Sequence, residues 1–445
     1  MIFMSTSNLE ILEKKIINKK IEEYEIYYIE SKIYETQFIQ RKIDSEREVN
    51  KIDYIIRILD QKGNNTGIGV IKGNSFDDKQ IDKDIDKCQT LSKLNSTTKY
   101  YFPVEKSYAK ISIAELDIIK NPLTIKQKFI DILLSSIDNL KNTIPSFGKF
   151  RVHIQDKYLR NSNSLNLNSK KTYFFFEFAL KAEENNKLVE YWDYEYVKHS
   201  SELNFKERVE KWSKSTLDSL KAQQPNPKKN TNVIFSPNLL KDAINSVLSF
   251  HASGQAFYDK TSNFQLEQEV ADEKINLIDN GLLNGGLNSN SWDGEGNPHQ
   301  KMELINKGIF KNRIFDQKYA ILKDTNSTGN GIRTSEGSIT NTISNLVILP
   351  GKLSLEEMIS SIKEGYFVEK CSWLNPDKFS GSFGAEIRNG YYIKNGKLEN
   401  SIKGGNISGN VLQMLNNCNY ISKKCKFSEN SYFPYIAFSN LNISA

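Results

Sequence analysis

The first two hundred residues combine amphipathic helical segments with runs of β-branched and aromatic residues. Apolar side chains recur every three or four positions among charged ones in four segments, which predicts helices at 8–22, 77–94, 123–140 and 205–221. Short β-branched and aromatic runs predict strands at 25–29, 36–40, 53–59, 67–71 and 110–113. Alternating apolar and polar residues predict an antiparallel meander through 150–154, 165–168, 172–180 and 189–196.

The second half places one helix among glycine-rich loops and short strands. Ser236 and Pro237 have the chemistry of a helix start, and apolar residues at 247, 248, 250, 256 and 257 continue a helical stripe. The polar stretch 223–230 contains two prolines and is the clearest linker.

We therefore predict an α+β protein, with an N-terminal antiparallel sheet, flanking helices and a strand-rich C-terminal domain. Its expected parts are an α+β domain at 1–104, a middle meander with helices at 105–222, and a C-terminal domain at 231–445.

Composition excludes several classes of function. The 60 basic and 54 acidic residues are spread evenly and give a net charge of only +6, so no basic patch favours nucleic-acid binding. No apolar run is long enough to cross a membrane, and the charged N-terminal segment is unlike a secretory signal. We therefore expect a cytoplasmic protein. The four cysteines form no C-x-x-C pair and are expected to be buried or incidental thiols.

Two places carry candidate chemistry. His251 is the single histidine on the predicted second-half helix, and one imidazole is too few for a zinc site. Asp293, Glu295 and His299 lie within seven residues of one another, which suits either a metal or acid-base cluster or an ordinary polar turn. The glycine-rich loops 281–287 and 325–333 lack the Gly-Lys-Ser/Thr ending of a phosphate-binding loop, so turns explain them better.

A series of segments in the second half occurs in a distinctive order. It runs from Trp-Asp-Gly-Glu-Gly-Asn-Pro-His-Gln at 292–300 through 304–310, 327–331, 342–346, 349–351, 354–359, 381–385, 393–398 and 407–412. In this order the chain resembles the TldD/PmbA family, also called modulators of DNA gyrase or peptidase U62. These proteins form paired subunits of a zinc metallopeptidase that acts on small unstructured peptides. The first half resembles the family more loosely.

The resemblance implies which kind of subunit this is. The TldD kind carries H-E-A-x-G-H on its central helix and a late cysteine. With Gly254 on the motif glycine, Phe250, His251 and Gln255 replace the first His, the Glu and the second His. Cys425 lies several residues too early for the late cysteine. The chain thus looks like the PmbA/TldE kind, which has no metal of its own.

We therefore expect a non-catalytic subunit, inactive alone, that forms a dimer with a zinc-bearing TldD-like partner and helps to bind unfolded peptides. Asp293, Glu295, His299, Gly329 and Asn330 are the expected residues of the peptide chamber's loops. Two alternatives stay open. One is a homodimeric peptide-binding protein; the other is a metallopeptidase with an atypical site drawn from His251, His299, Asp293, Glu295 or Cys425.

Overall fold

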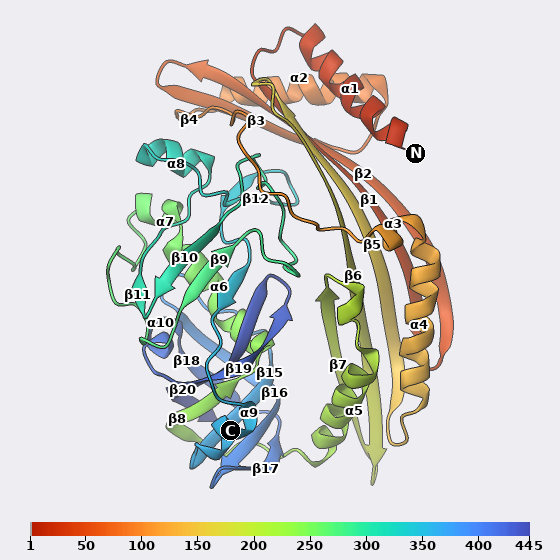
Figure 1. Ribbon diagram of the computed structural model, residues 1–445, viewed down its shortest axis with the longest axis vertical. Coiled ribbons are helices and arrows are strands. Elements are labelled where there is room, and N and C mark those ends of the chain that lie inside the picture. Colours follow the sequence, from red (N-terminus) through yellow and green to blue (C-terminus); the bar gives the residue numbers. More distant parts are fainter. Residues whose placement is uncertain (1) are drawn as a thin grey trace.

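The structure is a computed structural model that describes residues 2–445. Two sheets dominate it, and their side-by-side arrangement confirms the predicted α+β class (Figure 1). The long, curved strands of the N-terminal sheet run along one side of the C-terminal domain (Figure 1).

The N-terminal sheet has seven antiparallel strands in the order β4-β3-β2-β1-β5-β6-β7. They are β1 (Tyr24–Ile39), β2 (Lys42–Lys62), β3 (Asn65–Gly73), β4 (Thr97–Thr98), β5 (Ile144–Asn161), β6 (Asn166–Glu184) and β7 (Lys187–Val197). Because β1 pairs with β5 along most of its length, the boundary expected at 104/105 falls within the span of a single sheet.

Helices cover one face of this sheet. They are α1 (Ile2–Asn18), α2 (Asp78–Leu94), α3 (Leu116–Lys120), α4 (Pro122–Asp138) and α5 (Phe205–Lys221), with a 3-10 turn at Ser200–Glu202. Successive side chains of a strand point to opposite faces, so Ile26 and Tyr28 pack against the helices. Glu25 and Tyr27 then point toward the C-terminal domain, where they contact Arg333 and Trp292.

For most predicted elements of the N-terminal half the type, helix or strand, is correct, whereas the residue bounds often differ. The helices predicted at 77–94, 123–140 and 205–221 are α2, α4 and α5. The strands predicted at 25–29 and 36–40 are one strand, β1, and those at 165–168 and 172–180 are both part of β6. The strand predicted at 110–113 is wrong. That segment is irregular. Its Ile113 carbonyl accepts the Thr172 N–H where β6 extends beyond the end of β7, and it also accepts from the Lys198 side chain.

The C-terminal domain is built on a sheet of eleven strands. Its strands are β8 (Lys228–Phe235), β9 (Leu277–Asn280), β10 (Lys301–Asn306), β11 (Ile309–Phe310), β14 (Leu346–Ile348), β15 (Glu364–Ser372), β16 (Ser382–Lys394), β17 (Lys397–Ile402), β18 (Asn406–Asn410), β19 (Cys418–Ser428) and β20 (Ser431–Ser444). Because β20 also pairs with β8, the strands β8, β15, β16, β18 and β20 close into a ring. A separate hairpin joins β12 (Gly331–Arg333) to β13 (Ile339–Asn341).

Helix α6 (Pro237–Ala252) is the central helix of this domain, and α7 (Gly254–Tyr258), α8 (Gln317–Lys323), α9 (Leu355–Ser360) and α10 (Val411–Leu415) are shorter. The predicted start is confirmed, since the Ser236 side chain caps the N–H of Leu239 and Pro237 occupies the first turn. Ile244 and Val247 are fully buried in a core that α6 shares with the strand ring. No helix within residues 2–445 is long and apolar enough to cross a membrane.

The aromatic core under α4 and α5 yields a stability prediction. Phe150 is fully buried between Phe174 and Phe205, with ring centroids 5.9 and 5.7 Å away. We expect Phe150→Ala to lower the free energy of unfolding by about 3–5 kcal/mol, because it leaves a cavity in a packed core. Urea unfolding followed by circular dichroism measures the change. Phe147 on the same strand is 40% exposed and is the matched control. If Phe147→Ala lowered the free energy of unfolding as much as Phe150→Ala does, the burial of Phe150 would not be the cause.

Candidate functional site

The end of helix α6 places the three sequence-predicted positions in different surroundings. His251 is fully buried, and its Nδ1 accepts the backbone N–H of Asn263 at 3.0 Å. Burial lowers the pKa of His251, so the imidazole is neutral at physiological pH. This histidine therefore belongs to the core of the domain and faces away from solvent.

Phe250 and Gln255 lie nearer the surface. The Phe250 ring packs edge-on against Phe379 at 4.7 Å, with Lys378 Nζ 5.2 Å from its centroid. Gln255 is exposed, because the helix breaks at Ser253 and a new turn begins at Gly254.

A buried arginine holds this helix end in place. Arg313 donates to the carbonyls of His251 and Ser253 at 2.9 and 3.1 Å, and to that of Phe264 at 2.7 Å. Burial lowers its pKa to about 10, which leaves it charged at neutral pH and favourably placed at a helix C-terminus. The role of Arg313 could not be predicted from the sequence, since its partners lie about fifty to sixty residues away.

The three side chains at 250, 251 and 255 do not fit a zinc ion. Phenylalanine has no donor atom, and an amide is a weak zinc ligand. In His251 the Nδ1 lone pair accepts an N–H, so the Nε2 of the neutral ring, which has no partner among the described residues, carries the proton and offers no lone pair. Within residues 2–445, no three His, Cys, Asp or Glu side chains come together in an arrangement that could hold a metal. Cys425 lies on β19 opposite Pro434.

A cavity of about 570 Å³ opens over the exposed face of α6, and we call it the α6 cavity. Its walls come from α6, the helix break, the segment 340–343, the loop 374–378 and the turn between β19 and β20. Asn245, Ser249 and Ser253, spaced four residues apart, supply a neutral polar stripe along its floor. That spacing is visible in the sequence and is the signal by which this face could have been found.

Two amides in the wall of the α6 cavity have unused hydrogen-bonding atoms. Asn245 donates to Ser431 Oγ at 2.8 Å, but its Oδ1 has no partner among the described residues. Asn341 is only 6% exposed; it accepts the N–H of Gln255 through Oδ1, and its Nδ2 has no partner there either. Buried polar atoms without partners are costly, so a donor and an acceptor left open beside a cavity suit a polar ligand.

The hairpin β12–β13 has an open strand edge on β13, whose residues Thr340 and Asn341 line the α6 cavity. Bonds from Thr342 N to Asn330 O and from Thr334 N to Ser338 O fix which residues pair across the hairpin. By that alternation, the backbone groups of Ile339 and Asn341 point away from β12, and none of them has a partner within the described part of the chain. An extended peptide could pair with this edge.

The loop 292–300 lies at the contact between the two sheets and does not line the α6 cavity. Asp293 accepts the N–H groups of Glu295, Asn297 and Gly331, each at 2.9 Å. Burial, reinforced by Glu295, raises the pKa of Asp293. Glu295 accepts from the Tyr100 hydroxyl at 2.7 Å.

An ionic network joins this loop to the N-terminal sheet. Arg57 lies 3.5 Å from Glu25 and 3.8 Å from Glu295, and Arg333 pairs with Glu25 from the C-terminal domain. All four side chains are at most 5% exposed. Charges buried this deeply are stable only when each keeps its partners, so the network fixes how the domains meet.

The remaining predicted loop residues shape the polypeptide near this contact. Asn330 donates to Asp279 at 2.6 Å, and burial raises the pKa of Asp279 to about 6. Gly329 has φ +75°, and a Cβ there would lie 2.2 Å from the Pro298 carbonyl oxygen, so glycine is required. His299 is 6% exposed.

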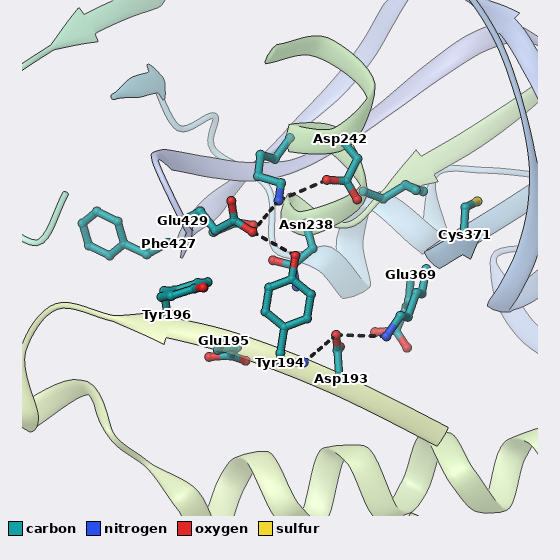
Figure 2. Close-up of a pocket in the computed structure, with 14 residues that line it drawn as sticks. Asp193, Tyr194, Glu195, Tyr196, Asn238, Asp242, Glu369, Cys371, Phe427 and Glu429 are labelled. Atoms are coloured by element: carbon teal, nitrogen blue, oxygen red, sulfur yellow. Dashed lines mark hydrogen bonds and ion pairs between the residues drawn. The ribbon is translucent and has the colours of Figure 1, made fainter. Parts of the chain in front are cut away.

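The turn between β19 and β20 connects the helix α6 to the N-terminal sheet, around a small pocket of about 90 Å³ (Figure 2). Glu429 accepts from Tyr194 of β7 at 3.0 Å and pairs with Lys241 of α6 at 3.0 Å. Lys241 also pairs with Asp242 at 3.1 Å. These contacts could not be predicted from the sequence, because Glu429 is more than 180 positions from both Tyr194 and Lys241.

The burial of His299 yields a prediction about pH. Burial, with a smaller contribution from Lys157, lowers the pKa of His299 to about 4 from about 6.5. Below pH 6.5 the unfolded chain therefore binds the proton more readily, and stability falls as the pH falls. Between pH 7.5 and 5, wild-type unfolding free energy should drop by about 2 kcal/mol more than that of His299→Gln. Urea titrations at both pH values measure the two unfolding free energies. If these fell equally in the wild type and in His299→Gln, burial of a neutral His299 would not be the cause.

Comparison with known proteins places the chain among metallopeptidase relatives. Residues 228–445 match the family model described as the PmbA/TldA metallopeptidase C-terminal domain. A metalloprotease TldD homolog of Buchnera aphidicola is 31% identical over 43% of this chain and 39% of its own length. A metalloprotease PmbA homolog from that organism is 22% identical over 84% of this chain and 83% of its own.

The fold matches over nearly the whole chain. The crystal structure of TldE from Thermococcus kodakarensis superposes with a TM-score of 0.86 at 22% identity, covering 98% of this chain and 100% of that one. By sequence, however, the chain spans less than half the length of several curated relatives that it matches. The structural match therefore establishes the architecture of both halves, and the sequence matches concentrate in the C-terminal half.

Proposed function

Since the chain belongs to the TldD/PmbA metallopeptidase family, we propose that it is a non-catalytic subunit of the PmbA/TldE kind. In this proposal it pairs with a zinc-bearing TldD-like subunit and helps to bind small unfolded peptides for cleavage by that partner. The proposal includes the cytoplasmic location expected from the sequence, which the four free thiols suit.

The observation that carries the proposal is the chemistry of the α6 cavity. Asn245, Ser249 and Ser253 line its floor, and Phe250 and Gln255 stand at the two positions where, by the resemblance, an active subunit would present histidine ligands to zinc. Neutral amides and hydroxyls bind peptide groups without activating water. The two carboxylates in the lining, Asp242 and Glu429, both pair with Lys241, so the cavity suits binding better than hydrolysis.

The open edge of β13 suggests how a peptide would be bound. The N–H and C=O groups of Ile339 and Asn341 offer main-chain hydrogen bonds that do not depend on the peptide's sequence. Most extended segments of a folded protein are already paired within its own sheets, so this mode favours unfolded chains. The open Asn341 Nδ2 and Asn245 Oδ1 would add side-chain contacts.

The rim of the cavity supports a partner surface. Trp373 is 93% exposed and Phe379 is 52% exposed, at either end of the loop whose residues 374–378 wall the α6 cavity. Large aromatic side chains gain most from burial at an interface. A partner seated on this loop would cover them and close the cavity.

A reconstitution experiment tests the proposal. The purified chain should show no peptidase activity, and mixing it with the H-E-A-x-G-H-bearing relative from the same genome should give co-elution and raise cleavage of an unfolded peptide at least tenfold. Trp373→Ser should weaken that co-elution. Equal cleavage by the relative alone would overturn the proposal. Homodimerisation with peptide binding and no effect on the relative would favour the stand-alone binding protein.

The strand edge yields a sharper prediction. Ile339→Pro removes one outward N–H from β13 and leaves the bonds to β12 intact. We expect at least a tenfold weaker dissociation constant for an unfolded peptide, measured by fluorescence anisotropy with the reconstituted pair. Ser338→Ala changes an exposed side chain just before the same strand, outside the lining of the α6 cavity, and should bind as the wild type does. Unchanged binding by a folded Ile339→Pro protein would show that the peptide does not pair with this edge.

A further inference from the structure

A second cavity, of about 210 Å³, lies between the inner face of the N-terminal sheet and the segment 288–294, and we call it the interdomain cavity. Three cationic side chains line it: Lys157 of β5, Lys171 of β6 and Arg333 of β12. The rest of its lining is mostly neutral, with Ser169 and Asn290 among the polar side chains.

The lysines of this cavity are poorly neutralised. Lys157 has no hydrogen-bond or ion-pair partner within the described residues, and Lys171 donates only to the Leu287 carbonyl. Burial, followed by the like charges of Lys157 and Lys198, lowers the pKa of Lys171. The one carboxylate in the lining is Asp293, which already accepts three backbone N–H groups.

Arg333 contributes a donor with no partner. Its side chain is 5% exposed, pairs with Glu25 through Nη2 and lies over the Tyr27 ring at 4.5 Å. Its Nε is buried and without a hydrogen-bond partner among the described residues. A guanidinium held this rigidly, with one N–H free, is preorganised to bind an oxygen anion.

We propose that the interdomain cavity is a binding site for a small oxyanion, contacted by Lys157, Lys171 and the free Nε of Arg333. The volume suits this class, since it is below the roughly 300 Å³ at which pockets for drug-sized ligands begin. Bound there, the anion would neutralise the like charges of Lys157 and Lys171 on the inner face of the N-terminal sheet.

Two sources could supply the oxyanion. One is free inorganic phosphate. The other is the terminal carboxylate of a peptide lying in the α6 cavity, because Asn288 and Ile332 line both cavities and so place them next to each other. The second source rests on the proposed peptide-binding function, whereas the first does not.

Inorganic phosphate is the first probe, titrated calorimetrically into the full chain at fixed ionic strength. We expect saturable binding to the wild type and at least tenfold weaker binding to Lys157→Met. Lys170 is the matched control, since it is next to Lys171 on the opposite face of β6, where it is exposed and paired with Asp156. Lys170→Met should bind as the wild type does.

A stability measurement keeps the test decisive. Without phosphate, Lys157→Met should melt at the same or a higher temperature than the wild type, because it removes a repulsive charge. Wild-type phosphate binding that Lys157→Met retains in full would overturn the proposal. If the wild type bound neither phosphate nor an unfolded peptide with a free C-terminus, the proposed site would be overturned as well.

A pair of peptides distinguishes the sources. One unfolded peptide with a free C-terminus and its C-terminal amide are titrated into the chain with and without phosphate. Tenfold tighter binding of the acid, competed by phosphate and lost in Lys157→Met, supports the site with a carboxylate as its occupant. Equal binding of both peptides beside retained phosphate binding supports the site with a free anion. If neither peptide binds while phosphate does, the proposed peptide function fails and the oxyanion site stands.

Discussion

The contact between the two halves depends on a small group of buried charges. Glu25 and Arg57 are directly opposite each other on β1 and β2, and Arg333 and Glu295 reach them from the C-terminal domain. Removing a charge from water costs several kcal/mol, and only well-placed partners repay that cost. The relative position of the sheets is therefore set by these ion pairs as well as by apolar packing. Because Arg333 of this network also lines the interdomain cavity, the network holds one wall of that cavity in place.

A break of one residue in the central helix determines the character of the candidate site. Ser253 ends α6 and caps α7, while Arg313 binds the carbonyls on both sides of the break. As a result His251 turns into the core and Gln255 turns outward. Packing thus explains the lone histidine on this helix. The stripe of α6 residues that lines the floor of the α6 cavity is formed by Asn245, Ser249 and Ser253.

The sequence predicted those features that are local. The helices α2, α4 and α5 and the Ser236 cap follow from periodicity and capping chemistry over a few residues. The length of β1 could not be predicted, because its middle residues are polar and are held by pairing with β2 and β5. The same holds for the site: Asn245 and Ser249 lay on a recognisable helix, whereas Asn341 and Arg313 reach the site only through tertiary contacts.

The strand ring has a consequence for the order of folding. Strand β20 pairs with β8, β14, β18 and β19, yet its residues, 431–444, are synthesised long after those of β8. The apolar faces of helix α6 and of β8, the first strand of the ring, therefore stay uncovered while about two hundred residues between β8 and β20 are synthesised. The N-terminal sheet is complete long before then. It can serve as a folded surface on which the unfinished domain is held until its last strand arrives.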